Sequence, residues 1–180
     1  GETCPQYLFF TENELQRPDG SKWNCSPPMR TSTDNARLWQ GLQQKTIQVI
    51  ATDHCPFFFD GTQPIHYEDQ FVAIPGKELG RGNFTKIPNG LPGVGDRLPV
   101  LWTFGVGSGK LTPNEFVALN CTNPARMFGL YPRKGTLTPG ADADISIWDP
   151  GMKVTYGATV AQHRTDYNLL REPINDMLKN

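Results

Sequence analysis

Apolar and β-branched residues form two short runs near the start of the chain. Residues 4–10, CPQYLFF, form an apolar and aromatic run that predicts the buried end of a strand. Residues 46–53 are β-branched, mostly apolar and end in an acid, which is typical of a central parallel strand with a functional tip. Between these runs, Thr33 or Asp34 can cap a helix over about 34–44.

Helical patterns follow a long polar segment. Residues 55–91 are rich in Gly and Pro, and a loop of this length is typically functional or disordered. Helices are predicted over 96–107 and 112–121, the second with a start signal in Thr112-Pro113-Asn114-Glu115. A short helix over 123–130 should stop at Gly129.

The pattern changes again after Pro132. Residues 135–137 and 143–149 alternate apolar and polar positions, which predicts short strands joined by a turn. A boundary near residue 134 therefore separates an α/β part, residues 1–134, from a small β module and a polar tail, residues 135–180.

Composition narrows the function classes. Hydrophobic residues make up 37% and charged residues 19% of the 180 residues, which is typical of a soluble globular protein. The net charge is −1 without a basic run, so we expect no nucleic-acid partner and no anionic membrane surface. No apolar run approaches the ~20 residues that span a bilayer. The chain starts without Met, which indicates a cut or processed end.

The four cysteines are Cys4, Cys25, Cys55 and Cys121, and none forms a CxxC pair. A thiolate zinc site is therefore not expected. Three of them follow apolar or strand-like stretches, where a cysteine usually behaves as a small buried hydrophobe. We expect them to be reduced and structural, which implies a cytoplasmic location.

The strongest chemical candidate is Asp53, at the predicted strand tip. In α/β barrels the carboxyl ends of the strands form the catalytic face, and a carboxylate there can bind a metal ion and accept a proton from water. The alternative is an Asp that only caps the loop through backbone hydrogen bonds. His54 should point to the opposite face and act structurally, and His66 and His163 are expected in solvent. Any metal at Asp53 thus needs ligands from elsewhere.

Two proline-containing segments can present backbone groups to a ligand. Ser26 precedes two prolines, and Asn89 lies in Ile87-Pro88-Asn89-Gly90. The alternative for both segments is a simple turn. Ser26 lacks the GxSxG context of a nucleophile.

These segments occur in one order along the chain: ETCPQYL from residue 2, CSPPMR from 25, ATDHCPF from 51, FTKIPNG from 84, NPARMFGLYPRKG from 123 and GADADI from 140. Together they closely resemble the C-terminal part of the dihydropyrimidinase/hydantoinase family, the cyclic amidases of the amidohydrolase superfamily. The resemblance covers roughly residues 1–167.

The resemblance implies an α/β fold, a distorted (β/α)8 TIM barrel with a small β-sandwich domain. Residues 1–134 would supply the last strands and helices of the barrel, and residues 135–180 the returning sandwich strands and the tail. A whole barrel takes ~250 residues, so we expect a C-terminal part and not a complete enzyme. The segment 62–81 looks longer than in the shorter family members.

The family's site holds two zinc ions, bridged by a carboxylated lysine and a hydroxide, with histidines as further ligands. Only Asp53 matches this set, as a catalytic residue and as the one metal ligand supplied here. Ser26 and Asn89 match the substrate-binding positions, whose backbone groups hold the cyclic amide. The family's oxyanion tyrosine and its HxH pair have no match in this sequence.

The implied activity is cleavage of the C–N amide bond in dihydropyrimidines and hydantoins, small-molecule substrates of pyrimidine catabolism. The complete enzyme would be a cytoplasmic homo-oligomer, a dimer or tetramer, whereas residues 1–180 alone should be inactive. A non-enzymatic dihydropyrimidinase-related scaffold is an alternative, although such proteins are not expected to keep Asp53. Allantoinase and dihydroorotase are further alternatives, but the CPQY and IPNG segments favour hydantoinase.

Overall fold

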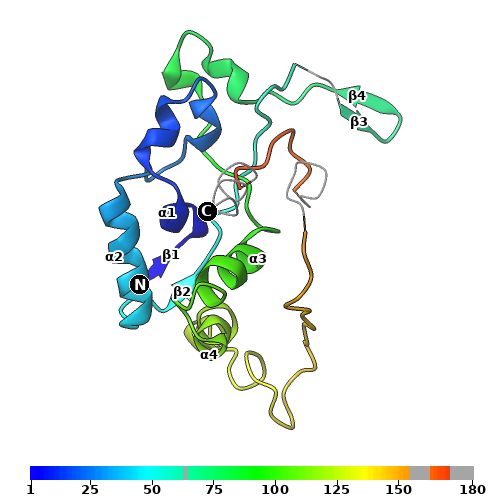
Figure 1. Cartoon of the computed structure of the whole chain (residues 1–180). Coiled ribbons are helices and arrows are strands. Elements are labelled where there is room, and N and C mark those ends of the chain that lie inside the picture. The colour runs from blue at the N-terminus through cyan, green and yellow to red at the C-terminus, as the bar shows by residue number, and fades with distance from the viewer. Residues whose placement is uncertain (63–64, 155–162, 171–180) are drawn as a thin grey trace.

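The computed structural model describes residues 1–62, 65–154 and 163–170 (Figure 1). Strands β1 (Glu2–Thr3) and β2 (Val49–Ile50) pair in parallel, with Thr3 opposite Ile50. A parallel pair needs a crossover, and helices fill the chain between the two strands. The parallel strand predicted over 46–53 is confirmed, although only two of its residues form the ladder.

The strand end predicted for residues 4–10 is wrong, because helix α1 (Pro5–Phe9) occupies these positions. The strand stops at Thr3, and Pro5 stands in the first helical turn, where its missing N–H costs nothing. A short apolar run does not by itself distinguish a buried helix from a strand.

Helix α2 (Ser32–Gln43) confirms the helix predicted over 34–44 but starts earlier. Its N-cap is Thr31, whose hydroxyl accepts a hydrogen bond from the Asp34 N–H while the Asp34 carboxylate accepts one from the Thr31 N–H. Asp34 therefore belongs to a capping box rather than being the cap itself. The Trp39 indole donates to the Leu8 carbonyl at 3.2 Å and fastens α2 to α1.

Two 3₁₀ turns, η1 (Glu12–Gln16) and η2 (Gly20–Trp23), link α1 to the Ser26 segment. The long loop after β2 contains an antiparallel hairpin, β3 (Ile65–Tyr67) and β4 (Gln70–Val72), which projects from the rest of the molecule in Figure 1. Two more turns follow, η3 (Lys77–Gly80) and η4 (Phe84–Lys86). The side chain of His66 lies outside the described part of the structure, so its prediction stays untested.

The later helices confirm the sequence pattern. Helix α3 (Arg97–Leu101) continues into a π-helical turn, η5 (Trp102–Val106). Helix α4 (Pro113–Val117), a second π-helical turn η6 (Ala118–Thr122) and α5 (Asn123–Met127) follow one another directly. Thr112 and Glu115 form the predicted capping box, and Gly129 adopts φ 68° just beyond α5.

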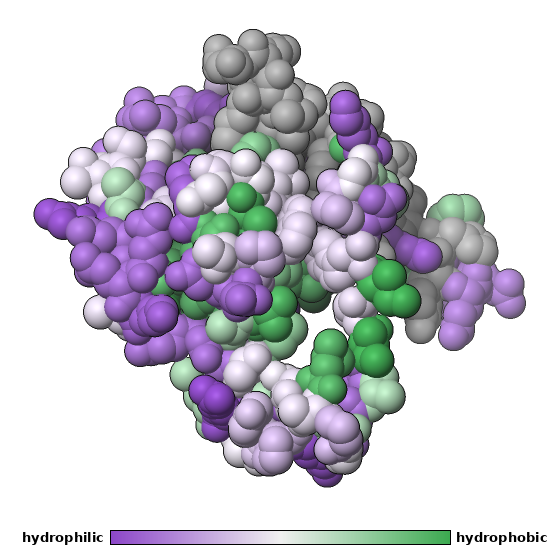
Figure 2. Space-filling view, turned by 60° about the horizontal axis from the view of Figure 1, so that its bottom comes forward, coloured by the Kyte–Doolittle hydropathy of each residue, from purple (hydrophilic) through white to green (hydrophobic). Residues whose placement is uncertain are grey.

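The strands predicted over 135–137 and 143–149 are not formed; these residues are irregular in the structure. Leu137, Ile145 and Ile147 are 77%, 62% and 96% exposed. Figure 2 shows apolar side chains, in green, at the surface on one face of the molecule. A strand needs a partner backbone to satisfy its N–H and C=O groups, and this segment pairs with none among the described residues.

Two apolar clusters form the core. One packs α1, α2 and β2 against the later helices through Leu8, Trp39, Leu42, Ile50, Leu101, Leu111, Phe116 and Leu119. The other joins the Ser26 segment to residues 163–170 through Phe10, Trp23, Cys25, Met29, Leu91, Val100, Tyr167, Leu169 and Leu170. Ile50, at the end of β2 and three residues before Asp53, belongs to the first cluster.

All four cysteines are free, as predicted, but only Cys4 and Cys25 are buried. Cys55 and Cys121 are exposed, so the expectation that most of the cysteines would be buried is wrong. Cys55 lies beyond the strand, in the loop. Among the helices of the described residues, none combines the length and the apolar character needed to cross a bilayer.

Candidate functional site

Asp53 stands three residues beyond the end of β2, with its side chain exposed. Its backbone adopts φ 49°, in the left-handed region that Asp tolerates better than most residues. Residues held in this region often occur at functional sites. Asp53 lines a cavity of about 650 Å³, together with residues of β1 and α1. The predicted strand tip therefore does present its carboxylate to an open space.

Cys4 and Tyr7 form part of the wall of this cavity. Burial, followed by the charges of Asp53 and Glu2, raises the pKa of the Cys4 thiol to about 12. Burial and the neighbouring Cys25 also raise the pKa of the Tyr7 hydroxyl well above its usual value. Both groups therefore stay neutral at physiological pH.

The Ser26 segment is held by its backbone. The Tyr7 hydroxyl donates to the Pro27 carbonyl at 2.9 Å, and the Cys25 thiol donates to the same carbonyl at 3.3 Å. The side chain of Ser26 is exposed. Sequence reasoning missed the role of Tyr7, because a tyrosine in an apolar run shows no sign of a partner 20 residues away.

The Asn89 segment contacts both other segments. The Gly90 N–H donates to the Asn24 carbonyl at 3.1 Å, and the Cys55 N–H donates to the Leu91 carbonyl at 3.0 Å. Gly90 adopts φ 149°, and a Cβ there would lie 2.4 Å from the Cys55 carbonyl oxygen. Only glycine permits this approach.

Three segments distant in sequence thus meet around the end of β2: those of Ser26, Asp53 and Asn89. Backbone hydrogen bonds join the Asn89 segment to the other two, and the Asn24 side chain also reaches the Ile87 carbonyl at 3.5 Å. Among the described residues that line the cavity, Asp53 and Pro27 are present, whereas Ser26 and Asn89 are not. The structure therefore brings the segments together without placing all three side chains in one pocket.

His54 has the structural role predicted for it. Its Nδ1 accepts hydrogen bonds from the N–H groups of Gly93 and Val94, at 3.1 and 3.2 Å. Burial, together with the neighbouring His163, lowers the pKa of His54. A neutral imidazole with a free Nδ1 lone pair is what these two donors require.

The expectation that His163 lies in solvent is wrong. Its side chain is fully buried, with Nδ1 4.0 Å from an Asp96 carboxylate oxygen. Burial raises the pKa of Asp96, although His163 opposes this shift. The cause is the packing of residues 163–170 into the core, which the polar sequence of the tail did not indicate.

Arg97 is a second residue that the sequence did not reveal. Its guanidinium donates to the Ile50 carbonyl at 2.8 Å and so braces the end of β2. Burial lowers its pKa. No group of three or more His, Cys, Asp or Glu side chains that could hold a metal ion exists among the described residues. Asp53 can thus supply one ligand and cannot form a metal site by itself.

Comparison with known proteins gives the family. Residues 11–179 match the model of the Amidohydrolase family. A D-hydantoinase of Streptomyces coelicolor is 45% identical over 170 residues, covering 93% of this chain and 33% of that protein. A D-phenylhydantoinase of Escherichia coli is 42% identical over 149 residues, covering 83% of this chain and 29% of that protein.

A solved structure agrees with this result. The dihydropyrimidinase from Brevibacillus agri NCHU1002 superposes with a TM-score of 0.83 at 41% identity, covering 93% of this chain and 34% of the other. The chain spans about a third of the length of these relatives. Their fold is the TIM barrel of the amidohydrolases, of which the chain matches a part. The chain therefore belongs to the amidohydrolase family.

Proposed function

We propose that the full-length protein is a metal-dependent hydrolase that opens the C–N amide bond of cyclic amides such as hydantoins and dihydropyrimidines. The printed names of its relatives, D-hydantoinase and dihydropyrimidinase, support this substrate class. The observation that carries the proposal is the position of Asp53, exposed at the end of a parallel strand and lining a cavity. The catalytic face of a barrel enzyme lies at such strand ends.

Asp53 is proposed to fill two roles in this enzyme. Its carboxylate binds a metal ion, and it also takes the proton from the attacking water as a general base. A metal ion supplies a nucleophile at neutral pH by lowering the pKa of water. Asp53 fits one position of such a centre, so the remaining ligands must come from other parts of the full-length protein. We propose two Zn²⁺ ions per site, of which this chain ligates one.

Ser26 and Asn89 are proposed to bind the ring through their backbone groups. Both side chains are exposed, and both segments are held by hydrogen bonds: the Tyr7 hydroxyl donates to the Pro27 carbonyl, and the Gly90 N–H donates to the Asn24 carbonyl. A rigid backbone that offers an N–H and a C=O is complementary to a cyclic amide, which carries one of each. Fixed donors and acceptors of this kind position a substrate at little entropic cost.

The finer features of the fold are also proposed. Residues 1–134 form the last part of a distorted barrel, and residues 135–180 return to a β-sandwich and end in the tail. The side chains of Leu137, Ile145 and Ile147 are apolar and exposed, which supports the proposal that this segment packs against strands from elsewhere in the full-length protein. We further propose that the full-length protein is a cytoplasmic homo-oligomer with a role in pyrimidine catabolism. The four free cysteines support the cytoplasmic location.

A substrate panel tests the proposal. The purified full-length protein, loaded with zinc, is given hydantoin, dihydrouracil, allantoin and dihydroorotate, and ring opening is followed for each. We expect the highest kcat/KM with hydantoin or dihydrouracil. A preference for allantoin or dihydroorotate would correct the substrate class. The absence of hydrolysis of all four compounds would refute the proposed hydrolase activity.

A further inference from the structure

Lys77 is a buried cation in the loop that follows β4. Its side chain is only 2% exposed, and it starts the 3₁₀ turn η3. Lysine is almost never buried to this degree without a partner. Within the described ranges no carboxylate pairs with it; its Nζ instead donates to the carbonyls of Asn24 and Pro88, at 3.1 and 3.2 Å.

These two carbonyls belong to the two segments proposed to hold the ring. Asn24 lies two residues before Ser26, and Pro88 lies directly before Asn89. The same two segments also meet without the lysine, because Gly90 N–H donates to the Asn24 carbonyl at 3.1 Å and the Asn24 side chain reaches the Ile87 carbonyl at 3.5 Å. The ammonium of Lys77 is thus a third link across one narrow junction.

The backbone that carries Lys77 is itself held firmly. The Lys77 N–H donates to the Phe58 carbonyl at 2.8 Å. The Glu78 carboxylate accepts hydrogen bonds from the N–H groups of Gly61 and Gly76, at 2.8 and 2.9 Å. An exposed lysine on a free loop could not fix the position of other segments, whereas this one can.

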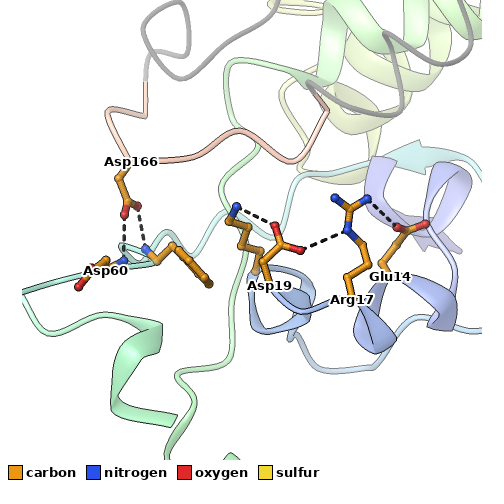
Figure 3. A network of polar contacts seen from close by, with 7 residues as sticks. Glu14, Arg17, Asp19, Asp60 and Asp166 are labelled. Carbon is orange, nitrogen blue, oxygen red and sulfur yellow. Dashed lines mark hydrogen bonds and ion pairs between the residues drawn. The ribbon is translucent and has the colours of Figure 1, made fainter. Parts of the chain in front are cut away.

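The base of the loop is fastened on its other side as well. The Asp166 carboxylate accepts hydrogen bonds from the N–H groups of Phe59 and Asp60, at 2.7 and 2.9 Å (Figure 3). The Lys22 ammonium lies 4.6 Å from the centre of the Phe59 ring and is paired with Asp19. The loop that carries Lys77 is therefore tied both to residues 163–170 and to η2.

We propose that Lys77 is a positioning residue, which sets the separation of the Ser26 and Asn89 backbone segments and so shapes the place where the ring binds. The inference rests on the proposed function. A charged donor forms stronger hydrogen bonds than a neutral one. Its removal takes one of two donors from the Asn24 carbonyl, which keeps the Gly90 N–H, and takes the ammonium from the partly buried Pro88 carbonyl. The segments would then move apart or admit water.

The test is Lys77→Met in the full-length zinc-loaded protein, with hydantoin as the substrate. Methionine keeps the length and the apolar stem and removes the donor. We expect KM to rise about tenfold or more, because the loss of hydrogen bonds from a charged group has this magnitude. The content of bound zinc should not change.

Two control variants separate positioning from simple loss of stability. Lys86→Met makes the same change at an exposed lysine of the same loop and should leave KM unchanged. Leu101→Ala, in the other core cluster, should lower the thermal midpoint and the yield of active protein with KM unchanged. If Lys77→Met does not fold, Lys77→Gln takes its place: it replaces the ammonium by a neutral amide donor and should raise KM above that of the parent, by less than about tenfold.

A second readout does not depend on activity. Amide hydrogen exchange of the segment 87–91 should become faster in Lys77→Met than in Lys86→Met. The reason is that the Asn24 carbonyl, which accepts from the Gly90 N–H, would no longer be held in place by the ammonium. An unchanged KM together with unchanged exchange in this segment would overturn the role of Lys77. A parent protein that hydrolyses no cyclic amide would refute the proposed function instead, and the exchange experiment would still decide whether Lys77 links the two segments.

Discussion

Asp53 and His54 are neighbours in sequence but have different environments. Asp53 is exposed to the cavity, whereas the His54 ring accepts two backbone hydrogen bonds from the loop at residues 93–94. In the full-length enzyme we expect Asp53→Asn to lower kcat at least ~100-fold, since loss of a general base typically costs this much. The fold should remain intact.

His54→Asn is the matched comparison. It should lower the thermal midpoint and affect kcat only through the loss of folded protein, because His54 is not among the described residues that line the cavity and its ring holds the loop at Gly93 and Val94. Measurement of kcat, bound zinc and thermal midpoint for both variants separates the roles. If His54→Asn lost the metal while Asp53→Asn stayed active, the assignment of the pair would be reversed.

The lowered pKa of Lys77 predicts how the stability of the protein changes with pH. Burial lowers its pKa from 10.5 to about 8, so between these values the unfolded chain binds more protons than the folded one. Stability contributed by this group therefore rises with pH across that window, and the cost of the buried charge is present in full below about 8. Between pH 7 and 10, the free energy of unfolding of the parent should increase relative to that of Lys77→Met. This range starts about one pH unit below the lowered pKa, where Lys77 begins to lose its proton.

Urea unfolding of the two full-length proteins at several pH values measures this difference. The raised pKa of Cys4 acts in the opposite direction at high pH, but it is present in both proteins and cancels. A stability difference that stays constant, or that falls with pH, would show that burial does not lower the pKa of Lys77.

The Asn89 segment of the loop is proposed to bind the cyclic amide through its backbone. Asn89→Ala removes only an exposed side chain, so its effect on kcat/KM of the full-length enzyme should be small. Asn89→Pro removes the N–H and restricts φ, so its effect should be severe. Steady-state kinetics of both variants provide the test, with equal, small effects excluding a backbone role.

The elements also show what the sequence could and could not predict. The start of α4 was predictable because Thr112, Pro113 and Glu115 act on each other within one turn. The helical state of residues 5–9 and the irregular path of 143–149 were not, because both depend on neighbours distant in sequence or on a partner strand.

The same division holds in the candidate site. The exposed position of Asp53 at the cavity was predictable from its place after a buried strand, whereas its role stays a prediction. Tyr7 and Lys77 were missed because their partners lie 20 and 53 residues away in sequence, so nothing in their local pattern indicates a role. The burial of His163 depends likewise on a tail whose own pattern is polar.

At the scale of the whole molecule, the chain corresponds to about a third of its relatives. Asp53 is its proposed metal ligand, and no group of three metal-binding side chains exists in the described ranges. The apolar positions at 145 and 147 are exposed, which fits a segment that pairs elsewhere in the full-length protein. Residues 1–180 alone should therefore not hold a catalytic metal pair.

The most direct measurement is hydantoin ring opening by the full-length protein and by residues 1–180, side by side, with added zinc and after removal of metal by a chelator. We predict turnover by the full-length protein that the chelator abolishes and zinc restores, and no turnover by residues 1–180. Stoichiometric zinc binding with turnover by residues 1–180, or a folded, zinc-loaded full-length protein without turnover, would contradict the account.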